Sequence, residues 1–456
     1  MPRTPALYRE RTGPRFFLGL GACPDYNGGN DLRLGGVREL RGEEKERCAR
    51  HTLRGCRGLD AMAIPQYPEP GKSVLFAGGF IKLDVQLGCR LIGLSGESSR
   101  KGEQVPVIPR EFVSSEDGES FVRRLEELPS LVLDKVATQH GHIVRESFID
   151  NMLVLLNRDH SGQVFLNAPM KASIQVKRAV NAGEVVSRDD IADVRELVFQ
   201  DIVIPNDVGV MVLFSVGWRK GFYYDLVPLS PEESTRDYDL NQLLGGYYAY
   251  LSFQARFGIP AGQWRSLFAN GWFPFITLTN RLVEEILAHN REGWNVDDLL
   301  PKVQAEVSAR LPNALKAWQT VGAFGAHLPF IVKAAEHYEN GDHLSCISVL
   351  FPRIEGILRS FQVAQGQADK TTQTDLAATV RSSGAHLEGH EFSPLLPLRF
   401  CEYLTEVYFA HFDPKQTDNS LSRNTVGHGV ATAQNFDAKG ATLGFLILDQ
   451  LSYYFS

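Results

Sequence analysis

Hydrophobic and polar residues change their spacing about halfway along this chain. Before residue 230, short apolar or alternating runs are separated by Gly, Asn and Asp, which is the pattern of a strand-rich region. Three such runs are 73–77, 164–166 and 172–176. The runs 209–215 and 222–227 predict a β-hairpin, because Gly217 and Gly221 between them can supply a tight connection.

From about Leu240 onward, the pattern changes to long amphipathic stretches, which predict helices. One helix is expected after the N-cap residue Asp342 and runs to about Gln362. Its apolar residues recur every three or four positions and predict one buried stripe. The stripe comprises Leu344, Ile347, Leu350, Phe351, Ile354, Leu358 and Phe361. Further helices are expected near 375–381, 395–412 and 420–428, and a central helix is expected over 441–455, which is apolar on nearly every side.

We therefore predict an α+β protein with three parts. A strand-rich region over residues 1–230 would be a sensor or regulatory part, and residues 231–320 would form a helical connection. Residues 321–456 would form an all-α bundle. The six cysteines are irregularly spaced in a chain of 456 residues, which favours reduced thiols in a cytoplasmic protein over a disulfide scaffold. No window has the roughly 18 uninterrupted apolar residues of a membrane span, and the N-terminus lacks a signal-peptide core, so no membrane partner is expected.

The net charge of −7 argues against a protein that coats nucleic acid non-specifically. The charge is uneven, however. Residues 1–60 hold twelve Lys/Arg and eight Asp/Glu, whereas residues 321–456 hold nine and fourteen. Any RNA bound by the last third must therefore be held by local arginines.

The segment from Arg423 to Gly429 has the residue types that phosphodiester chemistry needs. On a helix, Asn424 and His428 lie one turn apart on nearly the same face, whereas Arg423 projects about 140° from His428. The negative end of the helix dipole favours an imidazolium at His428, and Gly429 can end the helix in a left-handed conformation. His428 can transfer a proton and Arg423 can stabilise charge on a phosphate. The plain alternative is a surface arginine and an ordinary helix end.

The order of elements in this half resembles the HEPN superfamily. The resemblance rests on a long helix with Glu355 and Arg359, a polar loop, further helices, the motif Arg423-Asn424-x3-His428, and Lys439 at the start of an apolar last helix. It covers about 135 residues. It implies catalytic roles for Arg423, Asn424 and His428 and supporting roles for Glu355, Arg359 and Lys439.

The resemblance further implies a homodimer, formed through the C-terminal helices, that cleaves RNA without metal or cofactor. Such proteins are hydrolases of toxin or antiviral defence systems, so a protein trigger bound by the N-terminal region is a matching hypothesis. The rival from another class is a non-catalytic HEPN-like dimerisation scaffold. A small-molecule enzyme in the N-terminal region has no supporting constellation of residues.

Other groups of residues favour plain interpretations. Glu355 and Arg359 at i,i+4 predict a helix-face ion pair. Cys48, His51 and Cys56, with Cys23 upstream, fit no common zinc pattern, and the glycines after Phe17 lack the helix that a dinucleotide site needs. Residues 38–57 alternate in charge like a solvated helix, and His140 and His142 are expected in a loop.

Overall fold

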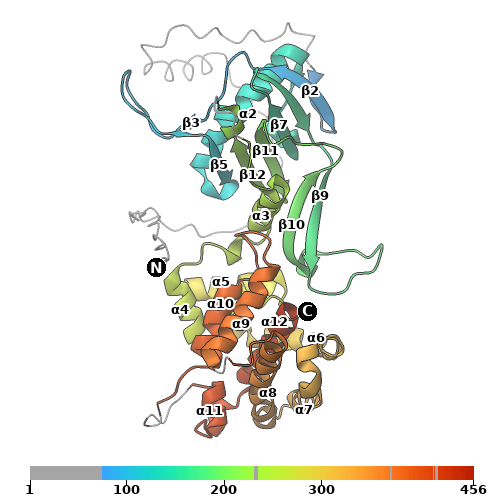
Figure 1. The fold of residues 1–456 in the computed structure, drawn as a ribbon, viewed down its shortest axis with the longest axis vertical. Helices are drawn as coiled ribbons and strands as arrows, with labels where there is room; N and C mark the ends of the chain where they lie inside the picture. Colours follow the sequence, from blue (N-terminus) through green and yellow to red (C-terminus); the bar gives the residue numbers. More distant parts are fainter. Residues whose placement is uncertain (1–73, 231–234, 370–371, 414, 416–419) are drawn as a thin grey trace, which may run out of the picture. The chain divides into compact units, whose positions relative to one another are not determined.

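The computed structural model describes residues 74–230, 235–369, 372–413, 415 and 420–456. Strands lie mostly in the first half and helices in the second, so the α+β prediction is confirmed at this level. Figure 1 shows this order along the chain. The predictions for the cysteines at 23, 48 and 56, for the glycines after Phe17 and for residues 38–57 fall outside the described residues.

Six strands form one antiparallel sheet in the order β2-β8-β7-β11-β12-β5. Its strands are β2 (Ile81–Gln86), β5 (Arg110–Ser114), β7 (Asn151–Leu156), β8 (Ser161–Leu166), β11 (Gly209–Val216) and β12 (Arg219–Asp225). Three smaller two-stranded pairs are β1 (Val74–Leu75) with β6 (His142–Ile143), β3 (Leu94–Ser95) with β4 (Val107–Ile108), and β9 (Met170–Val176) with β10 (Ile191–Phe199).

The predicted hairpin is β11–β12, and its turn is tighter than expected. Val216 pairs with Arg219, so only Gly217 and Trp218 connect the strands. Gly217 has φ of +62°, a left-handed conformation that glycine adopts without strain. Gly221 lies inside β12 instead of the turn, and a Cβ there would come within 2.9 Å of the Phe112 ring. Gly221 therefore allows the Phe112 ring to pack closely against the backbone of β12.

The sheet is covered on both faces, which explains why its inner strand β11 is apolar from Val210 to Phe214. Met211 and Leu213 of β11 pack in a core with α2 (Glu119–His140), whereas Val212 and Phe214 pack in a core with α3 (Leu240–Ser252). Successive side chains of a strand point to opposite faces, so a strand between two layers must be hydrophobic throughout.

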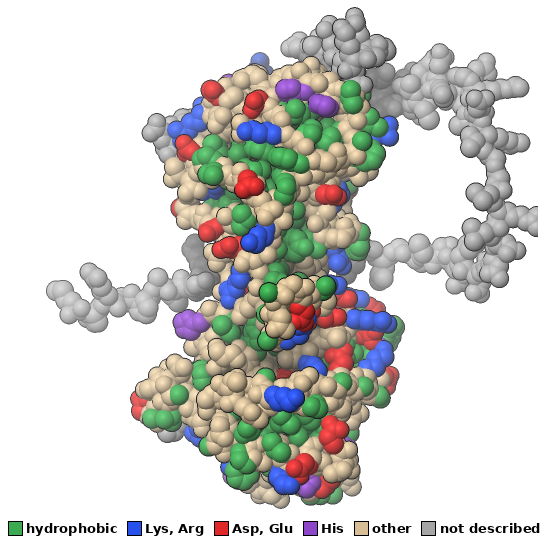
Figure 2. All heavy atoms as spheres, turned by 90° about the vertical axis from the view of Figure 1, so that its right-hand side faces the viewer, with side chains coloured by type: hydrophobic (Ala, Val, Ile, Leu, Met, Phe, Trp, Pro, Cys, Tyr) green, Lys and Arg blue, Asp and Glu red, His purple; other side chains and the backbone are tan. Residues whose placement is uncertain are grey.

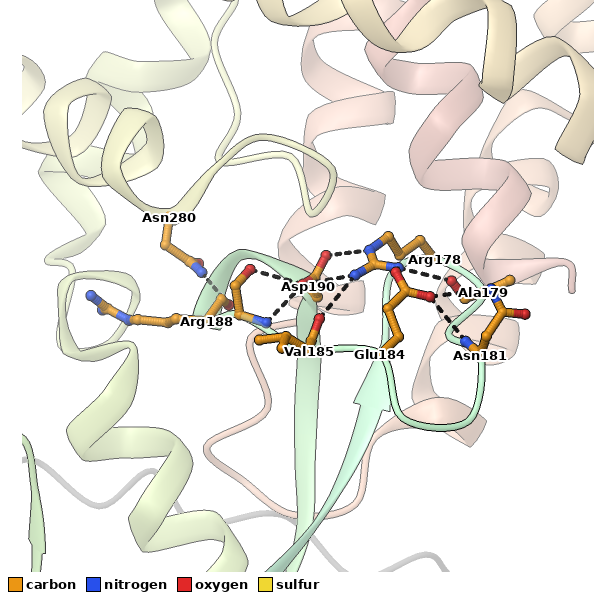
Figure 3. Close-up of polar contacts among 9 residues, drawn as sticks. Arg178, Ala179, Asn181, Glu184, Val185, Arg188, Asp190 and Asn280 are labelled. Carbon is orange, nitrogen blue, oxygen red and sulfur yellow. Dashed lines mark hydrogen bonds and ion pairs between the residues drawn. The ribbon is translucent and has the colours of Figure 1, made fainter.

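The β9–β10 ribbon is fixed at its tip and to the helical half. Figure 3 shows the Arg178 guanidinium between Asp190 and Glu184, where its Nε lies 2.5 Å from Asp190. The side chain of Asn280, the first residue of α5 (Asn280–Glu292), donates to the Arg188 carbonyl at 2.7 Å. These contacts connect the ribbon to the start of a helix some 90 residues later.

The second half is built from helices around one main core. They are α4 (Ala261–Ala269), α5, α6 (Leu300–Trp318), α7 (Leu328–Glu339), α8 (His343–Ala364), α9 (Gln373–Leu387), α10 (Pro397–Tyr403), a π-helical turn (Leu404–Tyr408), α11 (Arg423–Gly427) and α12 (Ala438–Tyr454). Short 3-10 turns lie at Ser115–Asp117, Glu146–Phe148, Arg188–Asp190, Val227–Leu229, Gln254–Arg256, Val296–Leu299, Gly322–His327 and Ala433–Asn435. The core extends across residue 320, and the division of the chain at that point stays a prediction.

Helices α8 and α12 form the centre of this core. Asp342 caps α8, as predicted, by accepting from the backbone N–H of Ser345. The expected stripe on α8 is buried except for Leu344, which is 52% exposed, so that part of the prediction is wrong. Helix α12 is buried almost throughout, which confirms its central place, and a Cβ on Gly444 would come within 2.6 Å of Leu350. Glycine thus allows the two helices to approach closely.

Two further observations concern the surface and the early histidines. Basic and acidic side chains are interspersed on the face drawn in Figure 2. None of the described helices combines the length and apolar character that a membrane crossing requires.

His140 is the last residue of α2 and His142 begins β6, so the expectation of a loop around both is wrong. Gly141 between them is left-handed and ends the helix.

Candidate active site

The candidate motif begins on a single short turn of helix with defined caps. Ser422 is the N-cap of α11 and forms a capping box with Thr425. At the other end the backbone N–H of Gly429 donates to Val426, and that of Val430 donates to the Thr425 carbonyl at 3.0 Å. This is a Schellman motif, and Gly429 has the left-handed φ of +68° that was predicted. The helix is shorter than the expected 420–428 because Ser422 starts it and His428 ends it.

Arg423 is held by a carboxylate from another helix. Its Nε forms an ion pair with Glu355 on α8, and the Glu355 side chain is only 8% exposed. The second oxygen of the same carboxylate accepts from Arg359, at 2.9 Å from Nε and 2.6 Å from Nη2. The predicted pair of Glu355 and Arg359 is confirmed. The Glu355 carboxylate thus contacts two guanidinium groups, one through each oxygen.

The backbone around Gly427 accommodates the Arg423 guanidinium. A Cβ placed on Gly427 would lie 2.5 Å from Nη1 of Arg423, closer than real Cβ contacts come. The guanidinium therefore lies against the residue directly before His428. Backbone projection alone gave an angle of about 140° between Arg423 and His428, but the long side chain folds toward the end of the helix.

His428 is exposed at the end of α11. It is the C-cap residue, and its ring centroid lies 5.3 Å from that of Phe412. Because the imidazole is exposed, a phosphodiester can reach it without displacing buried groups, and the Arg423 guanidinium lies against Gly427, the preceding residue in the sequence. This geometry suits proton transfer to or from an oxygen of such a substrate.

Asn424 lies in different surroundings from His428. Its side chain is buried, and Nδ2 donates to the Phe409 carbonyl at 2.9 Å and to Gln373 at 3.2 Å. Its Oδ1 accepts from Nε2 of Gln373 at 2.8 Å. Asn424 therefore fixes α11 to the end of the π-helical turn and to the start of α9.

Lys439 contacts a different set of groups. Its Nζ lies 2.6 Å from Asp297 and 5.5 Å from the ring centroid of Trp272. Lys439 also lines a cavity of about 350 Å³ together with Ser420 and Leu421, which precede α11. This shared cavity is what connects Lys439 to the segment just before the motif.

Tyr408 also lies near this cluster, although no sequence motif marks it as a candidate residue. It lies in the π-helical turn, is buried, and donates from its hydroxyl to the Phe351 carbonyl at 2.6 Å. Burial, and then the negative charge of Glu355, raise the pKa of Tyr408 well above its ordinary value. A neutral tyrosine therefore lies close to the ion pair of Glu355 and Arg423.

Within the described residues, no group of three or more His, Cys, Asp or Glu side chains is placed to hold a metal ion. Comparisons with protein-family models, with curated proteins and with solved structures find no match for this chain. The resemblance to the HEPN superfamily therefore stays a prediction that rests on the residues described above.

Proposed function

We propose that the C-terminal helices act as a HEPN-type endoribonuclease that cleaves RNA without a metal ion. In this proposal, His428 transfers protons, and Arg423 stabilises the negative charge that develops on the phosphate. Glu355 orients Arg423, and Arg359 binds the other oxygen of the same carboxylate. The N-terminal region would regulate the activity in a defence or stress response.

One observation carries this proposal most of all. The Arg423 guanidinium is fixed against Gly427 by a buried carboxylate, directly before an exposed imidazole at His428. A preorganised cation needs no rearrangement when charge develops on the substrate, so it lowers the barrier more than a mobile surface arginine would. The exposed ring meets the requirement that a proton-transfer group must reach the substrate.

The chemistry also favours two copies of the site. Cleavage by the 2′-hydroxyl removes a proton from that oxygen and delivers one to the departing 5′-oxygen, leaving a 2′,3′-cyclic phosphate and a 5′-hydroxyl. A single chain offers one His428, whereas a symmetric dimer offers one imidazole for each transfer. Two such clusters would double the local positive charge of an otherwise acidic region.

A specific observation supports the rival function, a non-catalytic scaffold. The Asn424 side chain is buried and donates to the Phe409 carbonyl, and Arg423 forms an ion pair with Glu355. Both residues therefore have structural roles that need no catalysis. The His428 side chain, by contrast, is exposed, and its ring lies near that of Phe412. The two functions therefore differ most at this histidine.

The decisive experiment compares the wild type with His428→Ala and His386→Ala. His386 is an exposed histidine in the last turn of α9, which makes it a matched control. Each protein is incubated with RNA, with and without EDTA, and the new ends are mapped. We expect EDTA-insensitive cleavage with cyclic phosphate ends, lost by ~10²- to 10⁴-fold in His428→Ala only. Equal cleavage by His428→Ala, or 3′-hydroxyl ends that EDTA abolishes, would contradict the proposal.

A further inference from the structure

A second cavity, of about 530 Å³, lies away from the Arg423 cluster. It is formed by Arg110 of β5, by the start of α3 and by the segment Gly389–Phe392 after α9. Cavities of this size bind small molecules or single side chains. The function proposed above assigns no role to this cavity.

The segment after α9 is firmly attached, so this wall of the cavity is already in place. The side chain of Gln242 on α3 donates to the Gly389 carbonyl. Nε2 of His390 lies 2.7 Å from the Val194 carbonyl, and the Ser393 hydroxyl donates to Asp193 at 2.7 Å. A ligand in the cavity would therefore contact α3 and a segment of the helical half together.

The cavity already stabilises one guanidinium, that of Arg110. This group lies 4.6 Å from the ring centroid of Tyr238, and its Nη2 is 3.2 Å from the fully buried carboxylate of Asp225. The Tyr238 hydroxyl also donates to Asp225, at 2.5 Å. The charge of Arg110 is thus compensated from within the protein, and it leaves little attraction for a phosphate.

The rest of the lining combines aromatic rings and carboxylates with one histidine, His390, whose Nε2 lies 3.4 Å from the buried carboxylate of Asp193. The ring centroids of Tyr247 and Phe392 are 6.0 Å apart. Burial, and then the charge of Glu391, raise the pKa of Tyr247 to about 12, so its hydroxyl stays neutral beside that carboxylate. Glu391 and Asp237 are exposed, and neither forms an ion pair with another described residue. Arg110 is the only lysine or arginine among the described residues that line the cavity.

We infer that this cavity binds an organic cation, an ammonium or guanidinium group placed between the aromatic rings and Glu391. Aromatic faces attract such cations through their quadrupole, and the attraction grows when solvent is partly excluded. The carboxylates of Asp237 and Glu391 add charge of the right sign. The group can come from a free polyamine or from the side chain of an arginine in a partner protein, since the chemistry is the same.

The test is isothermal titration calorimetry on the 456-residue chain with agmatine, spermidine, capped arginine amide and neutral butylurea. We expect agmatine to bind and butylurea to give no heat above dilution. Glu391→Gln should weaken agmatine about two- to fivefold, the range for an exposed charge pair, while Glu126→Gln, an exposed position on α2, should change nothing. Tyr247→Leu should weaken it about two- to thirtyfold through loss of the ring.

The titrations also separate the two sources. Binding of agmatine and spermidine without capped arginine amide assigns the site to free polyamines, whereas tighter binding of the capped amide assigns it to a protein side chain. Glu391→Gln changes an exposed residue and tests the site even if Tyr247→Leu fails to fold. Equal binding of butylurea and agmatine, no heat from any cation, or unchanged affinity in Glu391→Gln and a folded Tyr247→Leu would overturn the inference.

Discussion

Glu355 on α8 and Arg423 on α11 form an ion pair across 68 positions of sequence, and the carboxylate is almost completely buried. Arg359 contacts the other oxygen of that carboxylate. The buried charge is therefore compensated on both oxygens. The ion pair holds α11, the short helix on which the candidate motif begins. Loss of the pair should therefore lower both the stability of the protein and any activity of the motif.

Replacing Glu355 with Gln should reveal this double role. The side chain keeps its shape but loses its charge, which leaves two partly exposed arginines side by side. We expect a loss of about 1–3 kcal/mol in the free energy of unfolding, at the lower end of values for broken buried pairs because water can solvate both arginines. Urea unfolding measures it. The control is Glu336→Gln, whose exposed pair with Lys333 should change stability by only about 0–0.5 kcal/mol.

Gly427→Ala tests whether the Arg423 guanidinium lies where the structure places it. The backbone at Gly427 is helical, so alanine alone would stabilise the helix by about 0.5–1 kcal/mol. The new Cβ would instead meet Nη1 of Arg423, so we expect destabilisation in the wild type. In an Arg423→Ala background the same change should become stabilising. Stabilisation in both backgrounds would show that the guanidinium lies elsewhere.

Asn424→Ala should be destabilising by about 1–3 kcal/mol, because it leaves buried carbonyl and amide groups without partners. Asn424→Asp should cost more at pH 7, since a carboxylate would face the carbonyl oxygens of Phe409 and Ala410. Thermal melts at pH 7 and pH 4 measure both variants, and the aspartate variant should recover stability at the lower pH. Equal melting temperatures for Asn424→Ala and the wild type would place this side chain outside the packed structure. The resemblance implied a catalytic role for Asn424, and the buried contacts add this expected effect on stability.

Lys177 gives a prediction about pH. Its Nζ donates to the Leu278 carbonyl at 3.3 Å, and burial, followed by the charge of Arg256, lowers its pKa to about 7. Arg310 lowers this pKa further, and Asp189 and Glu306 oppose the effect. Below pH 7 the lysine is charged in both states, and its burial destabilises the folded protein.

Between pH 7 and about 10.5 the unfolded chain binds more protons at Lys177 than the folded one, so stability rises with pH through this window. Lys177→Met should therefore raise the melting temperature at pH 6 and have little effect near pH 10. Lys171→Met, at an exposed position on β9, is the control and should show no such dependence. A stabilisation by Lys177→Met that is the same at both pH values would contradict the lowered pKa.

The last prediction concerns assembly. If the two His428 side chains of a dimer supply the two proton transfers, the 456-residue chain should be dimeric by light scattering at micromolar concentration, and an interface variant that makes it monomeric should lose cleavage. A strictly monomeric protein that still cleaves RNA with His428-dependent kinetics would remove the need for a composite site.

The sequence by itself determined the local features of this protein. Alternation and glycine placement identified the β11–β12 hairpin, three- and four-residue spacing identified α8, and Asp342 and Gly429 set helix ends, because these depend on neighbours within a few residues. The sequence also selected Arg423 and His428 as chemically suitable residues. Each of these features is encoded in one short segment.

Tertiary structure decided which of those residues meet. The pairing of Arg423 with Glu355, the burial of Asn424 against Gln373 and the placement of Lys439 beside Asp297 join positions 68, 51 and 142 residues apart. Leu344 fits the apolar spacing of α8 but is 52% exposed. Contacts of this kind depend on how whole helices pack, and no periodicity within one segment records the partner that packing will bring.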